Sequence, residues 1–451
     1  MQPSNEPHFL LVGHEGCHNR GCEALVRTTV SILREEFPGA YFTIASSYPE
    51  NDVPLLDIKG LQVIPGLCRS PFIYQSHTSN YKRNNEALFN WKLSLYRFAA
   101  ASVPNGLIPR LRNLQSKVHV LKLPFPPRPN TEEGFNQVRH LKQTMLSATA
   151  VILIGGDMLN ETQGSFIHSL ESIEYAQFLG RKTVIWGSSF WPYNSLQARD
   201  RVKTMLQHCT LVTVRDESSY KYLESLGIKT NVSKVADGAF LMPPRPSEQA
   251  YVNWTSPPSF VVGFAGSSIF NSYLSSQGYS KKKIRQAIFT LTDFFQDIVD
   301  NQNAGVILVP HDAFPGSPER DFLYEIMLLI NRPNSVYMPP IGLPARETKA
   351  LIGKCDYFIG MRFHATIAAL SQSIPTLALS HSPKFTGLYK EIYGNIDYLV
   401  RYEDISSDVL SEKLDALQTG REDIRKMLAI RIPQLHTSAR YGGQYLKSLL
   451  S

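Results

Sequence analysis

Short apolar runs alternate with stretches of helical period along most of the chain. The run at residues 8–13, HFLLVG, precedes a segment whose apolar positions recur at helical spacing from Val26 to Phe37, and another apolar run occupies 40–47. The same order repeats around apolar runs that begin at residues 149, 183, 211, 260, 305, 356 and 376. This alternation predicts an α/β protein with parallel sheets and right-handed crossover connections.

One proline-rich stretch without either period interrupts this pattern. Residues 242–259 contain five prolines and precede a fresh apolar run. We therefore expect an N-terminal domain over residues 1–245, a C-terminal domain over 259–425, and a helical segment over 426–451 that packs on either of them. The length of 451 residues agrees with two domains, because single cores rarely exceed about 250 to 300 residues.

Composition describes an ordinary globular protein, with 43% hydrophobic and 19% charged residues. No window approaches the roughly 18 to 20 apolar residues of a membrane span, and the first residues lack the basic region of a secretory signal. The five cysteines are scattered without a framework, which favours reduced thiols. We expect a cytoplasmic protein, with peripheral contact at the inner face of the membrane left open.

Positive charge is concentrated in the segment 69–130. It holds ten Lys or Arg against one acidic residue, Glu86, so it carries more net positive charge than the +7 of the whole chain. Within it, Leu88, Trp91, Leu95 and Phe98 recur at helical spacing. The segment predicts a basic insertion that holds an anionic acceptor, contacts a membrane, or is solvated with one apolar face on the core. No nucleic-acid-binding module accompanies the charge, so nucleic acid is not an expected partner.

Ligands of parallel sheets gather where strands end and helices begin, which directs attention to four loops. The first, GHEGCHNRGCEAL at 13–25, holds His14, Cys17, His18 and Cys22. Its Cys-x4-Cys spacing departs from the common zinc knuckle and no second ligand pair follows, so we expect no metal here. We interpret the loop as a glycine-rich turn on the acceptor side of a cleft, with cleft residues Asn19, Gly21 and Glu23.

The second and third loops each combine a strand end with polar side chains. At 153–165, Gly155 and Gly156 permit close approach by a ligand, while Asp157 and Asn160 bond hydroxyls or cap the next segment. In VTVRDES, Asp216 or Ser218 is expected to cap a helix. Arg215 is a candidate ligand for a carboxylate or phosphate, or the partner of a neighbouring acid.

The fourth loop, at 358–371, carries the strongest signal. In FIGMRFHATIAALS, Arg362 and His364 stand where a buried strand meets a helix. A cation beside a titratable imidazole suits the binding of an acidic substrate and the transfer of a proton, although a histidine here is also compatible with a structural role.

Taken together, the motifs resemble those of the polysaccharide pyruvyltransferases. The resemblance rests on GxxxNRGxEAL, LIGGDMLNE, TVRDESSYKYLESLG, VADGAFL, LVPHD and the long block from ETKAL to SHSPKF. It implies two Rossmann-like domains that face a cleft, as in GT-B glycosyltransferases, with the donor on the C-terminal side. It also implies transfer of pyruvate from phosphoenolpyruvate to two hydroxyls of a sugar in a cell-surface or exopolysaccharide precursor, forming a cyclic ketal.

Carried over by motif, the donor-binding residues are Arg215, Arg362, Phe363 and His364. Two arginines and a helix N-terminus match the carboxylate and phosphate of phosphoenolpyruvate, and His364 is the candidate general acid. Asp157 or His311 is expected to accept hydroxyl protons, and Lys384 is expected to line the cleft. The family commonly has Asp where this chain has Cys22, which removes that acid from acceptor binding here.

Phosphoenolpyruvate would serve as co-substrate, and this chemistry requires no metal or redox cofactor. The expected acceptor is a sugar or glycan, free or lipid-linked. Two other functions remain open at this point. One is a nucleotide-sugar-dependent glycosyltransferase of the same architecture, and the other is a non-catalytic binding protein of a polysaccharide assembly complex.

Overall fold

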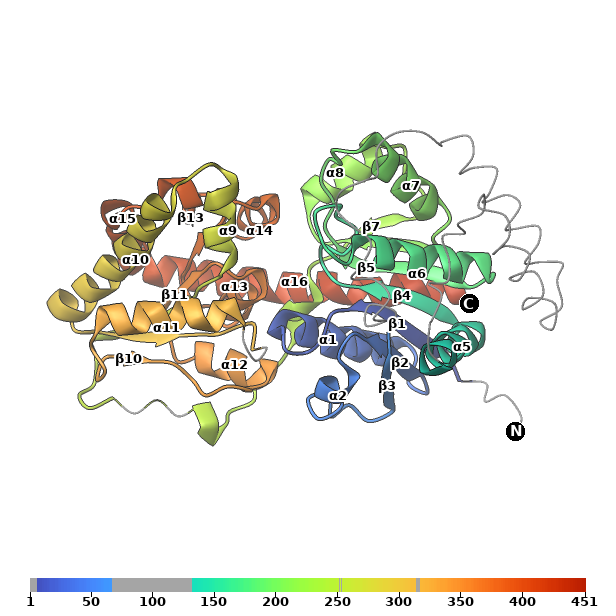
Figure 1. Ribbon diagram of the computed structural model, residues 1–451, viewed down its shortest axis with the longest axis horizontal. Coiled ribbons are helices and arrows are strands. Elements are labelled where there is room, and N and C mark those ends of the chain that lie inside the picture. Colours follow the sequence, from blue (N-terminus) through green and yellow to red (C-terminus); the bar gives the residue numbers. More distant parts are fainter. Residues whose placement is uncertain (1–5, 67–131, 251, 253, 314–316) are drawn as a thin grey trace.

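Two parallel β-sheets, one in each half of the chain, organise the computed structural model of the protein (Figure 1), which describes residues 6–66, 132–250, 252, 254–313 and 317–451. The first sheet has seven strands in the order β3-β2-β1-β4-β5-β6-β7, and the second has six in the order β10-β9-β8-β11-β12-β13. Every strand pair in both sheets is parallel. The predicted α/β class is therefore confirmed.

The N-terminal half carries seven strands, with helices between most of them. Its strands are β1 His8–His14, β2 Tyr41–Ser46, β3 Leu61–Pro65, β4 Ala150–Ile154, β5 Lys182–Ser188, β6 Leu211–Val214 and β7 Val232–Lys234. Its helices are α1 Arg20–Glu36, α2 Pro49–Asp52, α5 Glu132–Ser147, α6 Phe166–Phe178, α7 Leu196–Gln207 and α8 Glu217–Ser225, with short 3-10 turns η2 Gly238–Leu241 and η3 Glu248–Ala250.

The C-terminal half repeats this organisation around six strands. Its strands are β8 Phe260–Ala265, β9 Ala304–Leu308, β10 Val336–Tyr337, β11 Tyr357–Gly360, β12 Thr376–Leu379 and β13 Leu399–Val400. Its helices are α9 Ile269–Ser276, α10 Lys281–Gln302, α11 Pro318–Ile330, α12 Ala345–Ile352, α13 Phe363–Leu370, α14 Pro383–Tyr393, α15 Ser407–Thr419 and α16 Arg421–Leu450, with a 3-10 turn η4 Tyr402–Asp404.

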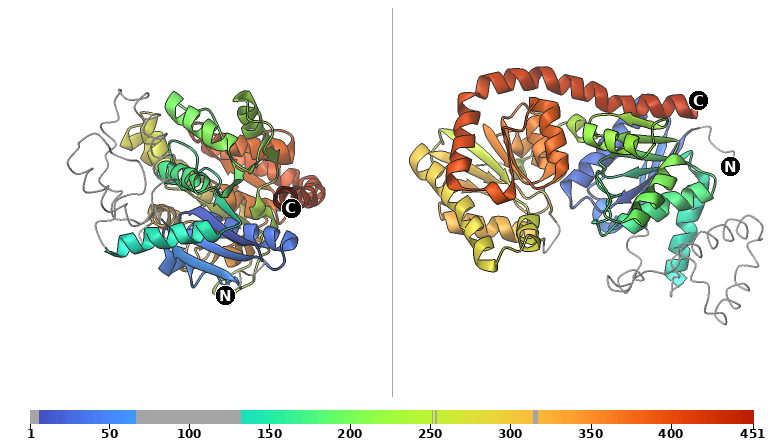
Figure 2. Two further views of the ribbon diagram at one scale, coloured as in Figure 1. Left: turned by 90° about the vertical axis from the view of Figure 1, so that its right-hand side faces the viewer. Right: turned by 90° about the horizontal axis from the view of Figure 1, so that it is seen from above.

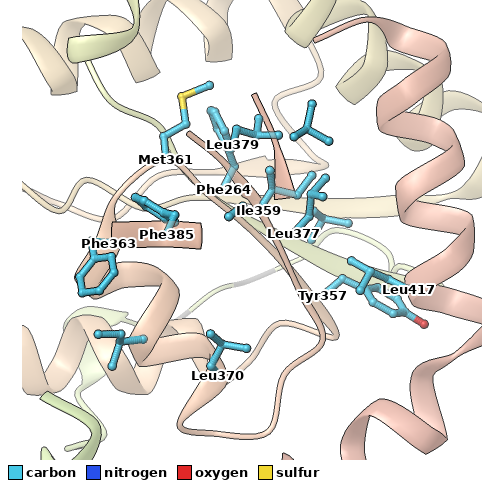
Figure 3. Packing of buried hydrophobic residues seen from close by; sticks show 14 of the residues in the cluster. Phe264, Tyr357, Ile359, Met361, Phe363, Leu370, Leu377, Leu379, Phe385 and Leu417 are labelled. Atoms are coloured by element: carbon cyan, nitrogen blue, oxygen red, sulfur yellow. The ribbon is translucent and has the colours of Figure 1, made fainter. Parts of the chain in front are cut away.

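The central strands are buried along almost their whole length. All five residues of β4 and all four of β11 are buried, because helices cover both faces of a parallel sheet. In the C-terminal half, the side chains of Phe264, Ile359 and Leu377 meet between the sheet and its helices (Figure 3). These continuous apolar strands are the ones that the sequence pattern identified.

The outermost strands were not identified from the sequence. Both edges of each sheet are formed by strands that the apolar pattern did not mark, and β10 and β13 have only two residues each. Along β3, only Ile64 is buried. A strand this short or this exposed leaves no apolar run, since one face and one edge remain in contact with water.

Helix α16 joins the two halves. Its Leu428, Ile432 and Leu435 belong to the core of the C-terminal half, whereas Leu446 belongs to the core beneath α1 in the N-terminal half. Figure 2 shows α16 running along one side of both halves. The segment that we expected to pack on either domain therefore packs on both.

Two further sequence expectations concern the basic insertion and membrane-spanning helices. The basic insertion at 69–130, with its apolar positions Leu88, Trp91, Leu95 and Phe98, lies outside the described residues. Among the helices that the structure describes, none is both long and apolar enough to cross a membrane.

Candidate functional site

The carboxyl ends of the two sheets face each other, and the expected site residues follow those strand ends. Arg215 comes directly after β6, Asp157 lies three residues beyond β4, and Arg362 to His364 follow β11 and begin α13. The two halves meet here: Arg215 Nη1 of the N-terminal half lies 3.5 Å from His364 Nε2 of the C-terminal half. The structure thus brings together residues that lie up to 207 positions apart.

Arg215 is almost fully buried and makes three side-chain hydrogen bonds within its own half. Its Nε donates to Ser189 Oγ at 2.9 Å, Nη1 to Asp237 Oδ2 at 2.7 Å and Nη2 to Asp157 Oδ1 at 2.9 Å. Arg215 therefore pairs with neighbouring acids, which was one of its two expected roles, and its role as a ligand for a carboxylate or phosphate stays a prediction. These carboxylates fix its position.

Asp237 is the residue that sequence reasoning missed at this point. It follows β7, is 3% exposed, and caps η2 by accepting from the Ala239 backbone N–H at 2.8 Å. Its Oδ2 lies 2.7 Å from Arg215 Nη1 and 3.6 Å from His364 Nε2. Asp237 therefore links the guanidinium of one half to the imidazole of the other. The motif VADGAFL contained it, but an aspartate before a 3-10 turn reads as a cap.

Phe363 forms part of the apolar wall of the site. Its ring packs against Phe385 at the edge of the C-terminal core (Figure 3), with ring centroids 5.3 Å apart. Arg215 Cζ lies 4.5 Å from the centroid of this ring and Lys384 Nζ lies 5.5 Å from it. The ring therefore holds two cations by cation–π contact while its other side belongs to the core.

Arg362 is positioned by a second acid that the sequence did not single out. Its Nε donates to Oε2 of Glu319, which is fully buried in α11, and its Nη2 lies 3.8 Å from Asp312 Oδ2. The other Glu319 oxygen accepts from the backbone N–H groups of His311 and Asp312. Glu319 thus joins the loop after β9 to the start of α13.

Two glycines allow groups of the site to approach the backbone. A Cβ placed on Gly156 would lie 2.1 Å from Arg215 Nη2, and one placed on Gly21 would lie 2.2 Å from His364 Nδ1. Neither distance leaves room for any side chain. Gly155 adopts a φ of 124°, which favours glycine. Gly156 and Gly21 therefore leave the space that Arg215 and His364 occupy.

Lys384 and Asp157 form an ion pair across the cleft. Lys384 Nζ, on α14, lies 2.6 Å from Asp157 Oδ2, while the second oxygen of Asp157 accepts from Arg215. These two cations lower the pKa of Asp157 to about 2 against the opposing effect of burial. Burial opposes but does not cancel the effect of Arg215 and His364 on Asp237, whose pKa also lies well below its usual value.

Three of the expected cleft residues have local or interdomain bonding roles. Helix α1 begins at Arg20, and Asn19 is its N-cap, with φ of −80°, and accepts from Gly21 N. Glu23 is fully buried and accepts from Arg27 Nε and from the backbone N–H of Ala345 in the other half. Asn160 accepts two bonds from Thr162 in its own loop.

The thiol and imidazole cluster of the opening loop gains a carboxylate in the structure. His14, Cys17 and Asp52 offer ligand atoms that all lie within 4.8 Å of one another. These groups bond to each other: His14 Nε2 lies 2.9 Å from Asp52 Oδ2 and 3.4 Å from Cys17 Sγ, and Asp52 accepts from the Cys17 backbone N–H. Burial beside Asp52 raises the pKa of the Cys17 thiol, so it is neutral in this arrangement.

Comparison with known families gives one match that spans most of the chain. The model of the family described as polysaccharide pyruvyl transferase matches residues 19–383. That range includes Arg215 after β6 and Arg362 to His364 at the start of α13, and it ends one residue before Lys384. No curated protein matches the chain.

Solved structures match the whole architecture at low sequence identity. UDP-GlcNAc 2-epimerase from Neisseria meningitidis, bound to UDP-GlcNAc, shares 12% identity over 97% of this chain and 99% of its own, with a TM-score of 0.54. UGT73P12 from Glycyrrhiza uralensis shares 10% over 99% and 96%, with a TM-score of 0.54. HepE from Anabaena, in complex with UDP, shares 13% over 99% of both chains, with a TM-score of 0.51. These matches show the GT-B-like fold that the sequence predicted.

Proposed function

Because the chain belongs to the polysaccharide pyruvyl transferase family, we propose that it transfers pyruvate from phosphoenolpyruvate to two hydroxyls of a sugar, as a cyclic ketal. The observation that supports this most directly is the meeting of Arg215 and His364 at the ring of Phe363, next to Arg362 at the N-terminus of α13. Phosphoenolpyruvate carries a carboxylate and a phosphate on adjacent positions, and two guanidinium groups beside a helix N-terminus suit those charges.

Donor binding would replace one of the acids that now pair with the arginines. Asp157 is the replaceable partner of Arg215, since its side chain is 19% exposed, whereas that of Asp237 is 3% exposed. Lys384 already holds the other Asp157 oxygen. When the donor carboxylate bonds to Arg215, Asp157 stays with Lys384, and Asp237 keeps Arg215 and His364 in place.

Proton delivery to the methylene carbon of the donor starts the reaction, with His364 as the acid. The new C–H bond uses the electron pair of the enol double bond, so the central carbon becomes electrophilic and a sugar hydroxyl attacks it. The C–O bond to phosphate then breaks, and the second hydroxyl closes the ketal. One hydroxyl proton replaces that given by His364, and the other leaves with phosphate.

Asp157 and His311 both remain candidates for accepting a hydroxyl proton, since each is held in its unprotonated form. Lys384 and Arg215 lower the pKa of Asp157 to about 2 against the opposing effect of burial. His311 is kept neutral because burial and the neighbouring positive charges of His364, Arg362 and Arg20 lower its pKa well below the usual value. It also lines the same cavity as His364.

Incubation of the purified protein with phosphoenolpyruvate and candidate glycan precursors tests this proposal. The expected result is phosphate release together with a mass increase of one pyruvate less one water. Phosphate release without that mass change, or neither signal over a wide acceptor set, would contradict it.

Replacement of His364, the proposed general acid, tests its role against a matched control variant. His364→Gln is expected to lower turnover by about 10²- to 10⁴-fold, the usual contribution of a positioned general acid, while phosphoenolpyruvate still binds. His208→Gln changes an exposed histidine at the end of α7 and serves as control. Turnover of His364→Gln within a few-fold of the control would remove His364 from this role.

Nucleotide-sugar glycosyl transfer is the second candidate, because two of the matched structures contain UDP or UDP-GlcNAc. Calorimetric titration with phosphoenolpyruvate and with UDP-, GDP- and CMP-sugars separates the two. Binding of a nucleotide sugar without binding of phosphoenolpyruvate would favour this alternative. A non-catalytic binding protein would bind donor or glycan and release no phosphate from their mixture.

A further inference from the structure

A small cavity between the two halves is lined by basic side chains from both. Arg20 of α1 and three residues of the C-terminal half, His311, Lys349 and His364, face it, and none of the described residues that line it is acidic. It shares no lining residue with the neighbouring pocket that contains Arg215, Phe363 and Lys384. The proposed mechanism uses His364 and His311 but gives no role to Arg20 or Lys349.

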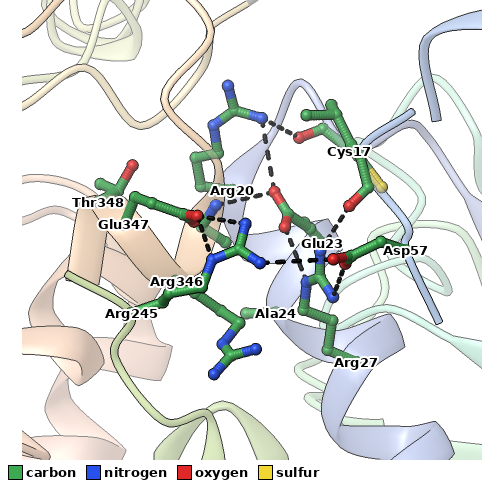
Figure 4. Close-up of polar contacts among 12 residues, drawn as sticks. Cys17, Arg20, Glu23, Ala24, Arg27, Asp57, Arg245, Arg346, Glu347 and Thr348 are labelled. Carbon is green, nitrogen blue, oxygen red and sulfur yellow. Dashed lines mark hydrogen bonds and ion pairs between the residues drawn. The ribbon is translucent and has the colours of Figure 1, made fainter. Parts of the chain in front are cut away.

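Arg20 is held at this position with part of its guanidinium unsatisfied. The residue is 2% exposed, and Nη1 donates to the Cys17 carbonyl at 2.8 Å and lies 3.5 Å from Glu23 Oε2 (Figure 4). Its buried Nε has no hydrogen-bond partner among the described residues. Glu23 is shared with Arg27 and the Ala345 backbone, so it does not satisfy Arg20 completely.

Lys349 is buried without a counter-charge. It is 2% exposed on α12, and within the described part of the chain its Nζ makes no hydrogen bond or ion pair. The nearest acid in sequence, Glu347, is engaged by Arg245 (Figure 4). An isolated ammonium is expensive to bury, so an unpaired lysine at an interdomain cavity indicates a missing anionic partner. Burial accordingly lowers the pKa of Lys349 to about 7.

The polar groups around the cavity do not supply that partner. Thr348 donates its hydroxyl to the Leu343 carbonyl at 3.2 Å. His436 of α16, whose positive form would repel Lys349, is turned to the Phe240 carbonyl at 3.1 Å. Two buried cationic side chains with open donors, one from each half, therefore converge beside the His364 imidazole.

We propose that this cavity is a second anion subsite, which binds a phosphate group through Arg20 of one half and Lys349 of the other. The proposal rests on the proposed function and extends it: the bound group is either the phosphate that leaves the donor or the diphosphate of an activated acceptor. A tetrahedral phosphate accepts hydrogen bonds from several directions at once, as an arginine Nε, an ammonium and an imidazole require. Bound there, it would join the two halves during turnover.

Calorimetric titration of the full-length protein with inorganic phosphate and with pyrophosphate tests the subsite without requiring turnover. Lys349→Met keeps the length of the side chain and removes its charge. It is expected to lower the affinity for at least one of these anions by about tenfold or more. The matched control is Lys282→Met, which changes an exposed lysine on α10 and should leave both affinities unchanged.

A second pair of variants tests the same subsite from the N-terminal half. Arg20→Gln is expected to lower the affinity for the same anion to a similar degree, and Arg20→Lys is expected to restore part of that affinity. This pair decides the matter if Lys349→Met does not fold. Anion affinities within twofold of wild type in every folded variant of these two positions would overturn the proposal.

Saturating phosphoenolpyruvate distinguishes the two sources of the phosphate group. If it abolishes the Lys349-dependent binding, the subsite holds the donor phosphate; if pyrophosphate still binds, the subsite serves the acceptor. Both outcomes support the subsite. If phosphoenolpyruvate does not bind but pyrophosphate affinity still depends on Lys349, the proposed function fails and the subsite stands. If turnover is observed but anion affinity does not depend on Lys349 or Arg20, the proposed function stands and the subsite proposal fails.

Discussion

At the residue scale, the absence of a side chain at Gly21 decides how His364 is seated. The imidazole of the C-terminal half rests against the first turn of α1 at a point where any Cβ would lie 2.2 Å from Nδ1. Gly21 has an ordinary helical backbone, so the helix itself would accept alanine and would gain roughly 0.5 to 1 kcal/mol from it. Its glycine is thus required by the approach of another residue.

Gly21→Ala is therefore expected to separate stability from activity. The free energy of unfolding should change by only about 1 kcal/mol, since the gain in helix propensity offsets part of the cost of displacing His364, while turnover should fall by about 10²-fold or more because the imidazole moves by about an ångström. Denaturant unfolding and phosphate release measure the two effects. Gly164→Ala is the control, because nothing lies within 4 Å of the added methyl group. Equal activity in both variants would contradict this role.

Lys349 gives a prediction for pH dependence at the same scale. Its pKa is about 7 in the folded protein against 10.5 when exposed, so between these values the unfolded chain binds a proton that the folded chain does not. The free energy of unfolding should therefore rise with pH across this window, by roughly 3 to 5 kcal/mol in total. Lys349→Met should lack this increment.

Unfolding curves are recorded from pH 7 to pH 10, without phosphate, for wild type and for Lys349→Met. The difference between the two free energies of unfolding measures the contribution of Lys349. The subtraction cancels the groups that both proteins share, including His311, His364, His436 and Arg20 around the cavity. Parallel pH profiles for the two proteins would show that Lys349 is charged in the folded state.

The sequence identified the cations of the site and the acid Asp157, but not the acids Asp237 and Glu319 that also hold these cations. Arg215, Arg362 and His364 stand at strand ends, where the rule for parallel sheets directs attention. Asp237 and Glu319 lie in a 3-10 turn and a first helical turn, where an acid usually acts as a cap. Their partners come from residues 22 and 43 positions away, a distance that no local pattern encodes.

At the scale of elements, α16 acts as a shared part of two cores. Its first half contributes Leu428 and Ile432 to the C-terminal core, and its second half contributes Leu446 to the N-terminal core. The Ser438 hydroxyl between them accepts from the Ala236 backbone N–H at 3.0 Å. The sequence predicted this helix from its periodicity, but periodicity does not say which surface an apolar face will meet.

Leu446→Ala is expected to destabilise the protein by about 2 to 5 kcal/mol, because it leaves a cavity beneath α1 and frees the end of α16. Leu449→Ala, on the same helical turn, changes a side chain that is 45% exposed and should cost well under 1 kcal/mol. Denaturant unfolding of both variants measures the difference. Similar small losses would mean that α16 is not bound to the N-terminal half in solution.

At the scale of the whole molecule, the two halves are joined by charged contacts across the cleft. One of these is the pair between Lys384 and Asp157, at 2.6 Å, with both side chains about one-fifth exposed. The α/β class followed from the alternation of apolar runs and helical stretches, and the facing of the two sheets was implied by the resemblance to the polysaccharide pyruvyltransferases. The sequence did not predict this ion pair, because its formation depends on the angle between the two halves.

Lys384→Met should increase the population of open molecules by about fivefold, which corresponds to loss of about 1 kcal/mol for a partly exposed pair. Amide hydrogen exchange in the loop at 155–160 should accelerate accordingly. Lys390→Met, on the exposed face of the same helix α14, is the control and should leave that exchange unchanged. Equal exchange in the two variants would assign closure to other contacts.

The path of α16 also has a consequence for building chimeras within this family. A single crossover in the proline-rich stretch at 242–259 would pair a foreign N-terminal half with this chain's α16, whose Leu446 is shaped to the surface of α1. The graft would bring a foreign N-terminal half and lose the part of the helix that fits it. A workable exchange therefore needs two junctions, one in that stretch and a second within α16 after Leu435, so that each half keeps its own part of the helix.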